Sequence, residues 1–217
     1  MKTKLLLLSV LLIISMRMFA QEDIVIDVKQ EETKKVNFGI GVAYGFFNPK
    51  EINDLVDNAF PSEDMEYGFS ELILNIVGKV NLNYNVSERF FITTYMEYAW
   101  APKFMTDESS DETFYYSFNR FAPGLSPKVL FPFGSGKHSF FFSPGVSYNF
   151  MNFKFDDADF ESTASNIGMK IQGGVNLQVG KVKMQPYMAY DYANSKDDKY
   201  DLELNYSGLQ MGIDFFF

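Results

Sequence analysis

The sequence predicts an all-β protein, an eight-stranded antiparallel up-and-down transmembrane β-barrel. The first observation is that apolar and polar residues alternate with period two over eight segments. The second is that short turns and long polar loops alternate between those segments, as they do in membrane barrels. The third is an aromatic content of 18%, with 24 Phe and 13 Tyr against one Trp. Aromatic rings in such numbers suit the girdles that flank the apolar band of a barrel.

The first twenty residues look like a secretory signal peptide. Lys2 and Lys4 precede an apolar run from Leu5 to Ile14, and Ala20 offers a small residue at the expected cleavage site. This run is too short for a membrane-spanning helix, which needs ~20 residues, and no later stretch is as apolar. We therefore expect a signal peptide over residues 1–20, a charged periplasmic lead-in over 21–35 and a barrel over 36–217.

Eight segments carry the strand pattern. The first sets apolar residues such as Phe38, Ile40 and Val42 against small residues that suit the inside of a narrow barrel. The expected strands cover residues 36–46, 71–84, 89–100, 114–133, 140–150, 167–179, 182–192 and 200–217. The fourth and eighth change parity, near Asn119–Arg120 and near Ser207–Gly208, which predicts a β-bulge in each.

Negative charge gathers in four long loops, expected over residues 47–70, 101–113, 154–165 and 193–201. They contain 17 acidic and 5 basic residues, a net charge of −12. Such loops could hold divalent cations that bridge to anionic lipopolysaccharide, but solvated loop tips explain them more simply. No metal or cofactor site is expected. The negative balance also disfavours nucleic acid as a partner.

The residues between the apolar positions indicate a polar lumen. Alternation alone does not say which face is inside, so a soluble lipocalin-like barrel with the opposite orientation remains a rival. One set carries both signs of charge, as a paired interior would, whereas the other has almost none. The predicted lumen network comprises Lys79, Glu97, Lys128, Lys170, Asp191 and Asp214. Against the barrel, Pro123, Pro127, Pro144 and Pro186 fall inside strands, where each removes a hydrogen-bond donor.

The sequence gives little support to catalysis. There is no cysteine, which excludes disulfides, thiolate metal sites and a cysteine nucleophile. His138 is the only histidine, and it follows a Gly-rich turn over residues 134–137, where a polar turn residue is the simpler interpretation. We expect no catalytic residues and no enzyme.

The end of the chain carries a family resemblance. Gln210, Gly212, Phe215 and Phe217 resemble the C-terminal signal that the barrel-assembly machinery reads in outer-membrane proteins. Residues 124–128 and 143–146 are similar to the "outer membrane beta-barrel domain" or porin-family proteins of Bacteroidetes-type bacteria, which include PorT-like proteins. The resemblance implies an OmpA/OmpX-like barrel in the outer membrane of a Gram-negative cell, with both termini in the periplasm.

Three functions are compatible with these observations. The first is a non-enzymatic barrel with a side-chain-filled lumen and acidic extracellular loops, serving envelope integrity, adhesion or partner docking. The second is a narrow pore or a barrel associated with transport or secretion, and the third is a lipid-modifying enzyme. The expected partners are outer-membrane lipid and lipopolysaccharide, the barrel-assembly machinery, and an envelope or secretion protein.

Overall fold

The computed structural model describes residues 36–47, 54, 73–107, 112–134, 138–155 and 160–217. The expected signal peptide, the lead-in and nearly all of the first long loop lie outside these residues. Among the described residues, no helix has the length and apolar character needed to cross a membrane.

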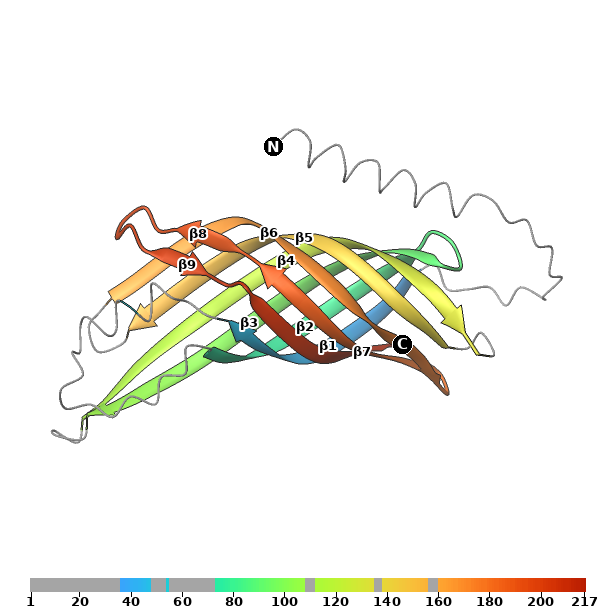
Figure 1. The fold of residues 1–217 in the computed structure, drawn as a ribbon, viewed down its shortest axis with the longest axis horizontal. Helices are drawn as coiled ribbons and strands as arrows, with labels where there is room; N and C mark the ends of the chain where they lie inside the picture. The colour runs from blue at the N-terminus through green and yellow to red at the C-terminus, as the bar shows by residue number, and fades with distance from the viewer. Residues whose placement is uncertain (1–35, 48–53, 55–72, 108–111, 135–137, 156–159) are drawn as a thin grey trace. The chain divides into compact units, whose positions relative to one another are not determined.

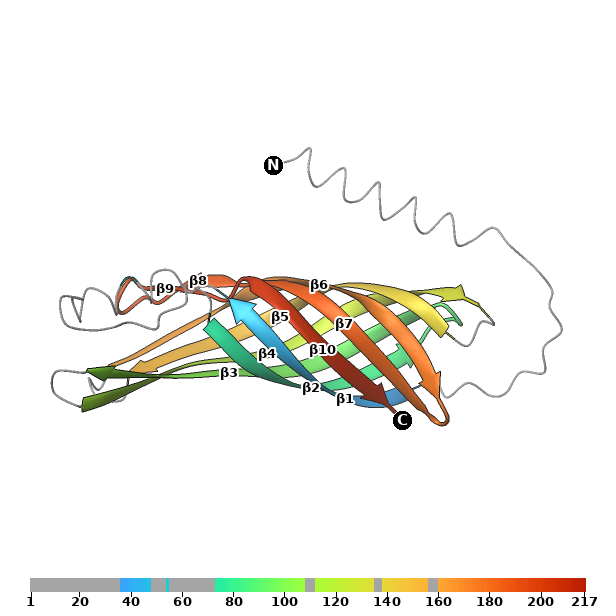
Figure 2. The same cartoon turned by 60° about the horizontal axis from the view of Figure 1, so that its bottom comes forward.

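Eight strands close into one antiparallel barrel, in the order β1-β10-β7-β6-β5-β4-β3-β2 (Figures 1 and 2). The final strand pairs with the first, so the sheet has no free edge along this ladder. The barrel strands are β1 (Val36–Phe47), β2 (Ile73–Asn85), β3 (Phe90–Asp107), β4 (Glu112–Phe133), β5 (His138–Phe155), β6 (Phe160–Val179), β7 (Val182–Tyr192) and β10 (Gly208–Phe216). The predicted fold class is confirmed.

The barrel exposes its apolar face and buries its polar one. In β1 the outward Val42 and Tyr44 are 59% and 60% exposed, while the inward Ala43 is 4% exposed. In β6 the outward Ile167 is 76% exposed, and the inward Lys170 only 3%. This distribution is the reverse of that in a water-soluble barrel, and it is the distribution of a barrel surrounded by lipid.

The second and third long loops are much shorter than the sequence predicted. β3 ends at Asp107 and β4 begins at Glu112. In the same way, β5 ends at Phe155 and β6 begins at Phe160. The expected loops 101–113 and 154–165 are therefore largely hairpin arms. The arms over 154–165 were mistaken for a loop because their outward positions, such as Lys154 and Glu161, are polar, which removes the alternation that marks the rest of each strand.

The expected fourth loop, residues 193–201, contains one arm of a hairpin over residues 194–196 and the hairpin tip that follows it. β8 (Asn194–Lys196) pairs with β9 (Glu203–Asn205), and this register continues that of β7 with β10. Between the two ladders the Tyr206 amide donates to the Ala193 carbonyl at 2.7 Å. The expected eighth strand is thus β9 and β10 in succession, and it forms one long hairpin with β7 and β8.

Neither predicted bulge is present. β4 keeps one register with β3 through Asn119 and Arg120, and β9 continues the register of β10 across Ser207. The apparent change of parity has another cause. Phe118 and Tyr206, near the loop end of the barrel, point into the lumen and are only 1% and 2% exposed.

Two of the strand prolines face each other across β4 and β5, and serines replace part of the missing ladder. The Ser126 hydroxyl lies 2.6 Å from the Pro144 carbonyl oxygen, and the Ser143 hydroxyl 3.2 Å from that of Pro127. The two hydroxyls are 2.6 Å apart. These contacts give hydrogen-bond partners to backbone carbonyls that face proline nitrogens, which have no hydrogen to donate.

Candidate functional site

A cluster of six charged side chains crosses the middle of the lumen, and we call it the central ion-pair cluster. Its members come from six of the eight barrel strands and are all at most 6% exposed. It consists of Lys79, Glu97, Arg120, Lys170, Asp191 and Asp214. Three cations face three carboxylates, so the cluster is electrically balanced, as a buried set of charges must be.

Glu97 on β3 lies at the centre of this cluster. One carboxylate oxygen accepts a hydrogen bond from Lys170 and lies 3.9 Å from Lys79. The other lies 3.7 Å from the Nη1 atom of Arg120. One carboxylate therefore balances cations from β2, β4 and β6.

A glycine allows the pairing of Lys79 with Asp214 across an intervening strand. Lys79 on β2 and Asp214 on β10 both lie opposite Gly41 of β1 in the register. Their side chains meet over it at 3.0 Å. A Cβ atom on Gly41 would collide with the Asp214 carboxylate, so the absent side chain makes room for the ion pair.

Asp191 on β7 completes the cluster. It lies 3.3 Å from Arg120 and 3.4 Å from Lys170, which is its direct neighbour across the strands. Arg120 also donates to Asn149 at 2.7 Å. The sequence analysis missed Arg120 because the bulge expected beside it left its direction open. Its spacing of eight residues from Lys128 on the same strand was the available signal.

A second group of side chains, the mouth cluster, fills the lumen at the loop end. Its members are apolar or aromatic, and none is more than 7% exposed. They are Phe47, Phe118, Met151, Phe153, Phe155, Leu202, Leu204 and Tyr206. Three of them lie on or next to the β8–β9 hairpin, and one of these, Tyr206, contacts the rings of Phe47 on β1 and Phe118 on β4. Sequence reasoning missed this group because it assumed that every inward position was polar.

Tyr206 joins the two clusters. Its ring lies 4.8 Å from that of Phe47, and the Arg120 guanidinium carbon lies 4.3 Å from the centroid of the same ring. Its hydroxyl donates to Asn75 at 3.1 Å. The lumen is therefore filled without a break between the apolar mouth and the charged middle.

Asp197 anchors the hairpin to the barrel wall. Its carboxylate accepts hydrogen bonds from the Ser162 hydroxyl at 2.6 Å and the Thr163 amide at 2.9 Å, both on β6. It also accepts from the amides of Lys199 and Tyr200 in its own tip. Burial alone would raise the pKa of Asp197, but these hydrogen bonds outweigh burial and hold the pKa below its usual range.

Lys128, the sixth residue of the predicted lumen network, lies apart from the central cluster. It forms no ion pair with a carboxylate of the described residues, although it is only 3% exposed. It donates to Gln185 at 3.0 Å and lies 5.1 Å from the ring centroids of both Phe141 and Phe216. The other five predicted members are brought together in the cluster described above.

The residues of the predicted assembly signal occupy different faces of β10. Gln210 points inward and accepts a hydrogen bond from Lys170 at 3.2 Å, and Gly212 packs against Ala43. Phe215 is half-buried, and Phe217 is 54% exposed. Phe216, between them, points inward and is 1% exposed. A role of this ending in assembly stays a prediction.

His138 and the acidic side chains are the groups that acid–base or metal chemistry would need. His138 is the first residue of β5 at the turn end, and its ring centroid lies 6.1 Å from that of Phe133. Among the described side chains, no three His, Asp or Glu groups are placed to hold a metal ion. The arrangement of the lumen instead provides closure.

No protein-family model matches the sequence, and no curated protein matches it either. Solved structures do match. The crystal structure of Neisserial surface protein A (NspA) is similar with a TM-score of 0.52 at 12% identity, over 83% of this chain and 96% of that one. The crystal structure of Ail, the attachment invasion locus protein of Yersinia pestis, is similar with a TM-score of 0.42 at 12% identity, over 84% of this chain and 97% of that one. The N-terminal β-barrel domain of Pseudomonas aeruginosa OprF is similar with a TM-score of 0.39 at 9% identity, over 83% of this chain and 98% of that one.

These comparisons bear on the fold. The match to NspA shows that the chain folds as a small eight-stranded barrel of the kind found in outer membranes. The narrower resemblance to Bacteroidetes-type or PorT-like proteins gains no support from them.

Proposed function

We propose that this protein is a non-enzymatic barrel of the outer membrane, with a closed lumen and with hairpin arms and acidic loops displayed outside the cell. There it would serve envelope integrity, adhesion or partner docking. The single observation that carries the proposal is the double closure of the lumen. The central ion-pair cluster and the mouth cluster block it at two levels, and both are buried.

The outer face supports the location. Large apolar side chains on all eight barrel strands are exposed to the surroundings, including Phe140 at 55% and Tyr190 at 52%. An apolar surface that encircles a protein invites aggregation in water, whereas a lipid bilayer covers it. A closed barrel also satisfies its backbone groups internally, as a membrane-spanning structure requires.

The direction of the chain follows from the lengths of its connections. β6 and β7 are joined through Gly180 and Lys181 alone, and the strands end together at the side where β1 begins and β10 ends. Outer-membrane barrels have short periplasmic turns and long outer loops. The proposal therefore assigns both ends of the barrel domain to the periplasm and the β8–β9 hairpin to the outside.

Conductance in a planar lipid bilayer tests the closed lumen. Purified protein is expected to insert without steady channels, because ions have no continuous aqueous path through the two clusters. Steady channels from the unmodified protein would favour the pore or transport alternative and contradict the proposal. A gel-shift assay run in parallel verifies that the protein in the bilayer is the folded, heat-modifiable barrel.

Photo-crosslinking in intact cells tests the display of the hairpin. A crosslinking amino acid at exposed Lys199, in the hairpin tip, is expected to capture surface components, whereas one at exposed Lys181, in a short turn, captures periplasmic ones. If a membrane-impermeant reagent added to intact cells labels position 181 but not position 199, the barrel has the opposite orientation to the one proposed.

A further inference from the structure

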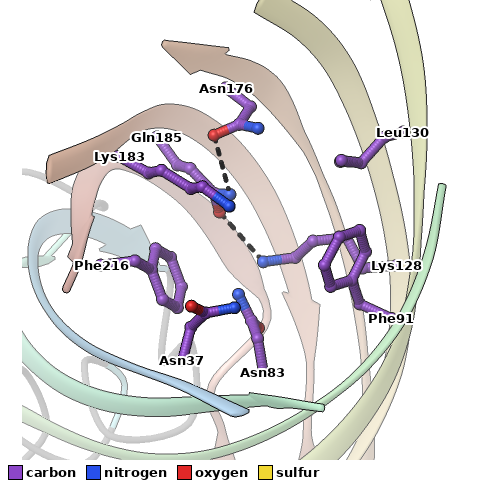
Figure 3. A pocket seen from close by; sticks show the side chains of 9 residues that line it. All are labelled: Asn37, Asn83, Phe91, Lys128, Leu130, Asn176, Lys183, Gln185 and Phe216. Atoms are coloured by element: carbon purple, nitrogen blue, oxygen red, sulfur yellow. Dashed lines mark hydrogen bonds between the residues drawn. The ribbon is translucent and has the colours of Figure 1, made fainter. Parts of the chain in front are cut away.

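A small cavity lies in the turn end of the lumen, below the central ion-pair cluster (Figure 3). Its free space is about 10 Å³, which is room for about one water-sized particle. Residues of β1, β2, β3, β4, β6, β7 and β10 line it. They are Asn37, Asn83, Phe91, Lys128, Leu130, Asn176, Lys183, Gln185 and Phe216.

The lining is rich in hydrogen-bond donors. Lys128 donates to the Gln185 oxygen at 3.0 Å, Gln185 donates to the Asn176 oxygen at 3.3 Å, and Asn176 donates to the Ser139 hydroxyl at 3.3 Å. This chain of bonds runs in one direction, so each amide oxygen along it is already occupied by a donor.

Two of the remaining groups, Asn83 and Lys128, add further donors, whereas Asn37 donates its amide nitrogen to Asn85 at 3.3 Å and so offers an acceptor oxygen. The Asn83 oxygen accepts from Thr93 at 2.6 Å, and Figure 3 shows the Asn83 amide nitrogen on the side of the cavity. An ammonium group has three donors and no acceptor, so Lys128 retains two after its bond to Gln185. Figure 3 shows the side chains of Lys128 and Lys183 extending toward the same space.

The charged residues around the cavity also favour an anion. Two lysines line it, and no carboxylate does. Asp214 is the carboxylate whose charge reaches Lys128, but Asp214 is already paired with Lys79 at 3.0 Å, and the Lys79 charge opposes its effect on Lys128. An ammonium group buried without a counter-charge is costly, and a single water would satisfy its donors without balancing its charge.

We propose that this cavity binds one small monovalent anion of the halide class, held by Lys128 with Asn83 and Lys183. The size of the free space selects a monatomic ion over phosphate, sulfate or an organic carboxylate. The rings of Phe91 and Phe216 give the site apolar sides. The anion stabilises the folded barrel because the unfolded chain has no such site.

The stability of the barrel in different anions tests this site. Urea unfolding of the purified protein in lipid vesicles is followed by gel shift at constant ionic strength, with chloride or bromide replaced by gluconate, which is too large to enter. At a halide concentration ten times its Kd, the folding equilibrium constant is expected to be about 11-fold higher than in gluconate.

Variants assign the effect to the cavity. Lys128→Met is expected to unfold with the same midpoint in chloride and gluconate, while Lys181→Met, which removes an exposed lysine of the neighbouring turn, keeps the full chloride response. If Lys128→Met does not fold, Asn83→Leu takes its place and is expected to weaken the halide response. Anomalous diffraction from crystals grown in bromide is expected to show a peak beside Lys128 Nζ.

Two results would overturn the proposal. One is an unmodified protein whose stability is the same in chloride, bromide and gluconate. The other is a halide response that persists in both cavity variants, because the ion would then act elsewhere. Neither result affects the closed lumen, which the conductance measurement tests separately.

Discussion

The central ion-pair cluster and the mouth cluster fill the same lumen with opposite chemistry. In the middle of the barrel, charged residues such as Glu97 and Lys170 point inward, and apolar residues such as Met96 and Met169 point outward. At the loop end, Phe153 points inward, while its neighbour Lys154 is exposed. On the same strand β5, Asn149 points inward and Phe150 outward, so the pattern of inside and outside inverts along one continuous strand.

This inversion has a physical explanation in the surroundings of the strand. Where lipid covers the outer face, apolar side chains belong outside and the interior takes the polar ones. Beyond the lipid, water surrounds the arms, and apolar side chains stabilise the structure by burial inside. The height at which the pattern inverts then marks the edge of the membrane on the side of the hairpin arms.

The largest expected effect comes from breaking the central cluster. Glu97→Gln leaves three buried cations against two carboxylates, and removing one partner of such a network costs about 3–5 kcal/mol. We expect the free energy of unfolding, measured by urea titration in lipid vesicles, to fall by that amount. The control Glu161→Gln, an exposed carboxylate bonded to Asn152, is expected to change it by less than about 0.5 kcal/mol. Equal losses in both would contradict the importance of burial.

A somewhat smaller effect is expected from the mouth cluster. Leu204→Ala removes a fully buried side chain, at a cost of about 2–5 kcal/mol. Because Leu204 lies on the hairpin, we expect this loss to open the hairpin first, seen as faster proteolysis between β8 and β9 while the heat-modifiable barrel persists. Asp198→Ala, an exposed change in the same tip, should leave the proteolysis rate unchanged. Loss of the whole barrel at once would show that the two clusters unfold together.

A third prediction compares two glycines on the two faces of the barrel. Gly41→Ala places a methyl group against the Asp214 carboxylate and is expected to destabilise by about 1–3 kcal/mol. Gly78→Ala places the same methyl group on the outer face, where no atom lies within 4 Å, and is expected to be neutral. Urea midpoints of the two variants decide this. A neutral Gly41→Ala would mean that the Lys79–Asp214 pair adapts freely.

The smallest expected effect is the pH dependence of the hairpin. Because the pKa of Asp197 is lowered in the folded state, its contribution is present above the pKa of the unfolded chain, about 3.9. That contribution is lost as the pH falls through the lowered folded value. Hydrogen exchange at the β8–β9 amides is expected to quicken over that acidic range. Asp197→Asn should remove the dependence, and its persistence in that variant would assign it to another group.

The sequence predicted the barrel because period-two alternation and closure are local and repetitive properties. β7, for example, has the boundaries expected for it, Val182–Tyr192. It did not predict the arms, because the inversion at the outer edge of the membrane removes the outward apolar signal. Phe118 and Tyr206 then looked like the product of bulges, although their strands keep one register.

The lumen could be predicted only in part. Inward parity identified five members of the central cluster, since strand periodicity places every second residue on one face. The parity of a residue does not show how high its side chain lies along the barrel axis or which side chains it meets across the lumen. It therefore could not separate Lys128 from that cluster, or show that Lys79 meets Asp214 over Gly41.

The most direct test of the central claim uses Trp100, the only tryptophan in the sequence. It points outward on β3 and is 45% exposed, near the height at which the pattern inverts. In vesicles of brominated lipid its fluorescence is expected to be strongly quenched, with little quenching by aqueous acrylamide. Strong quenching by acrylamide and none by brominated lipid would place the outer face in water and contradict the account.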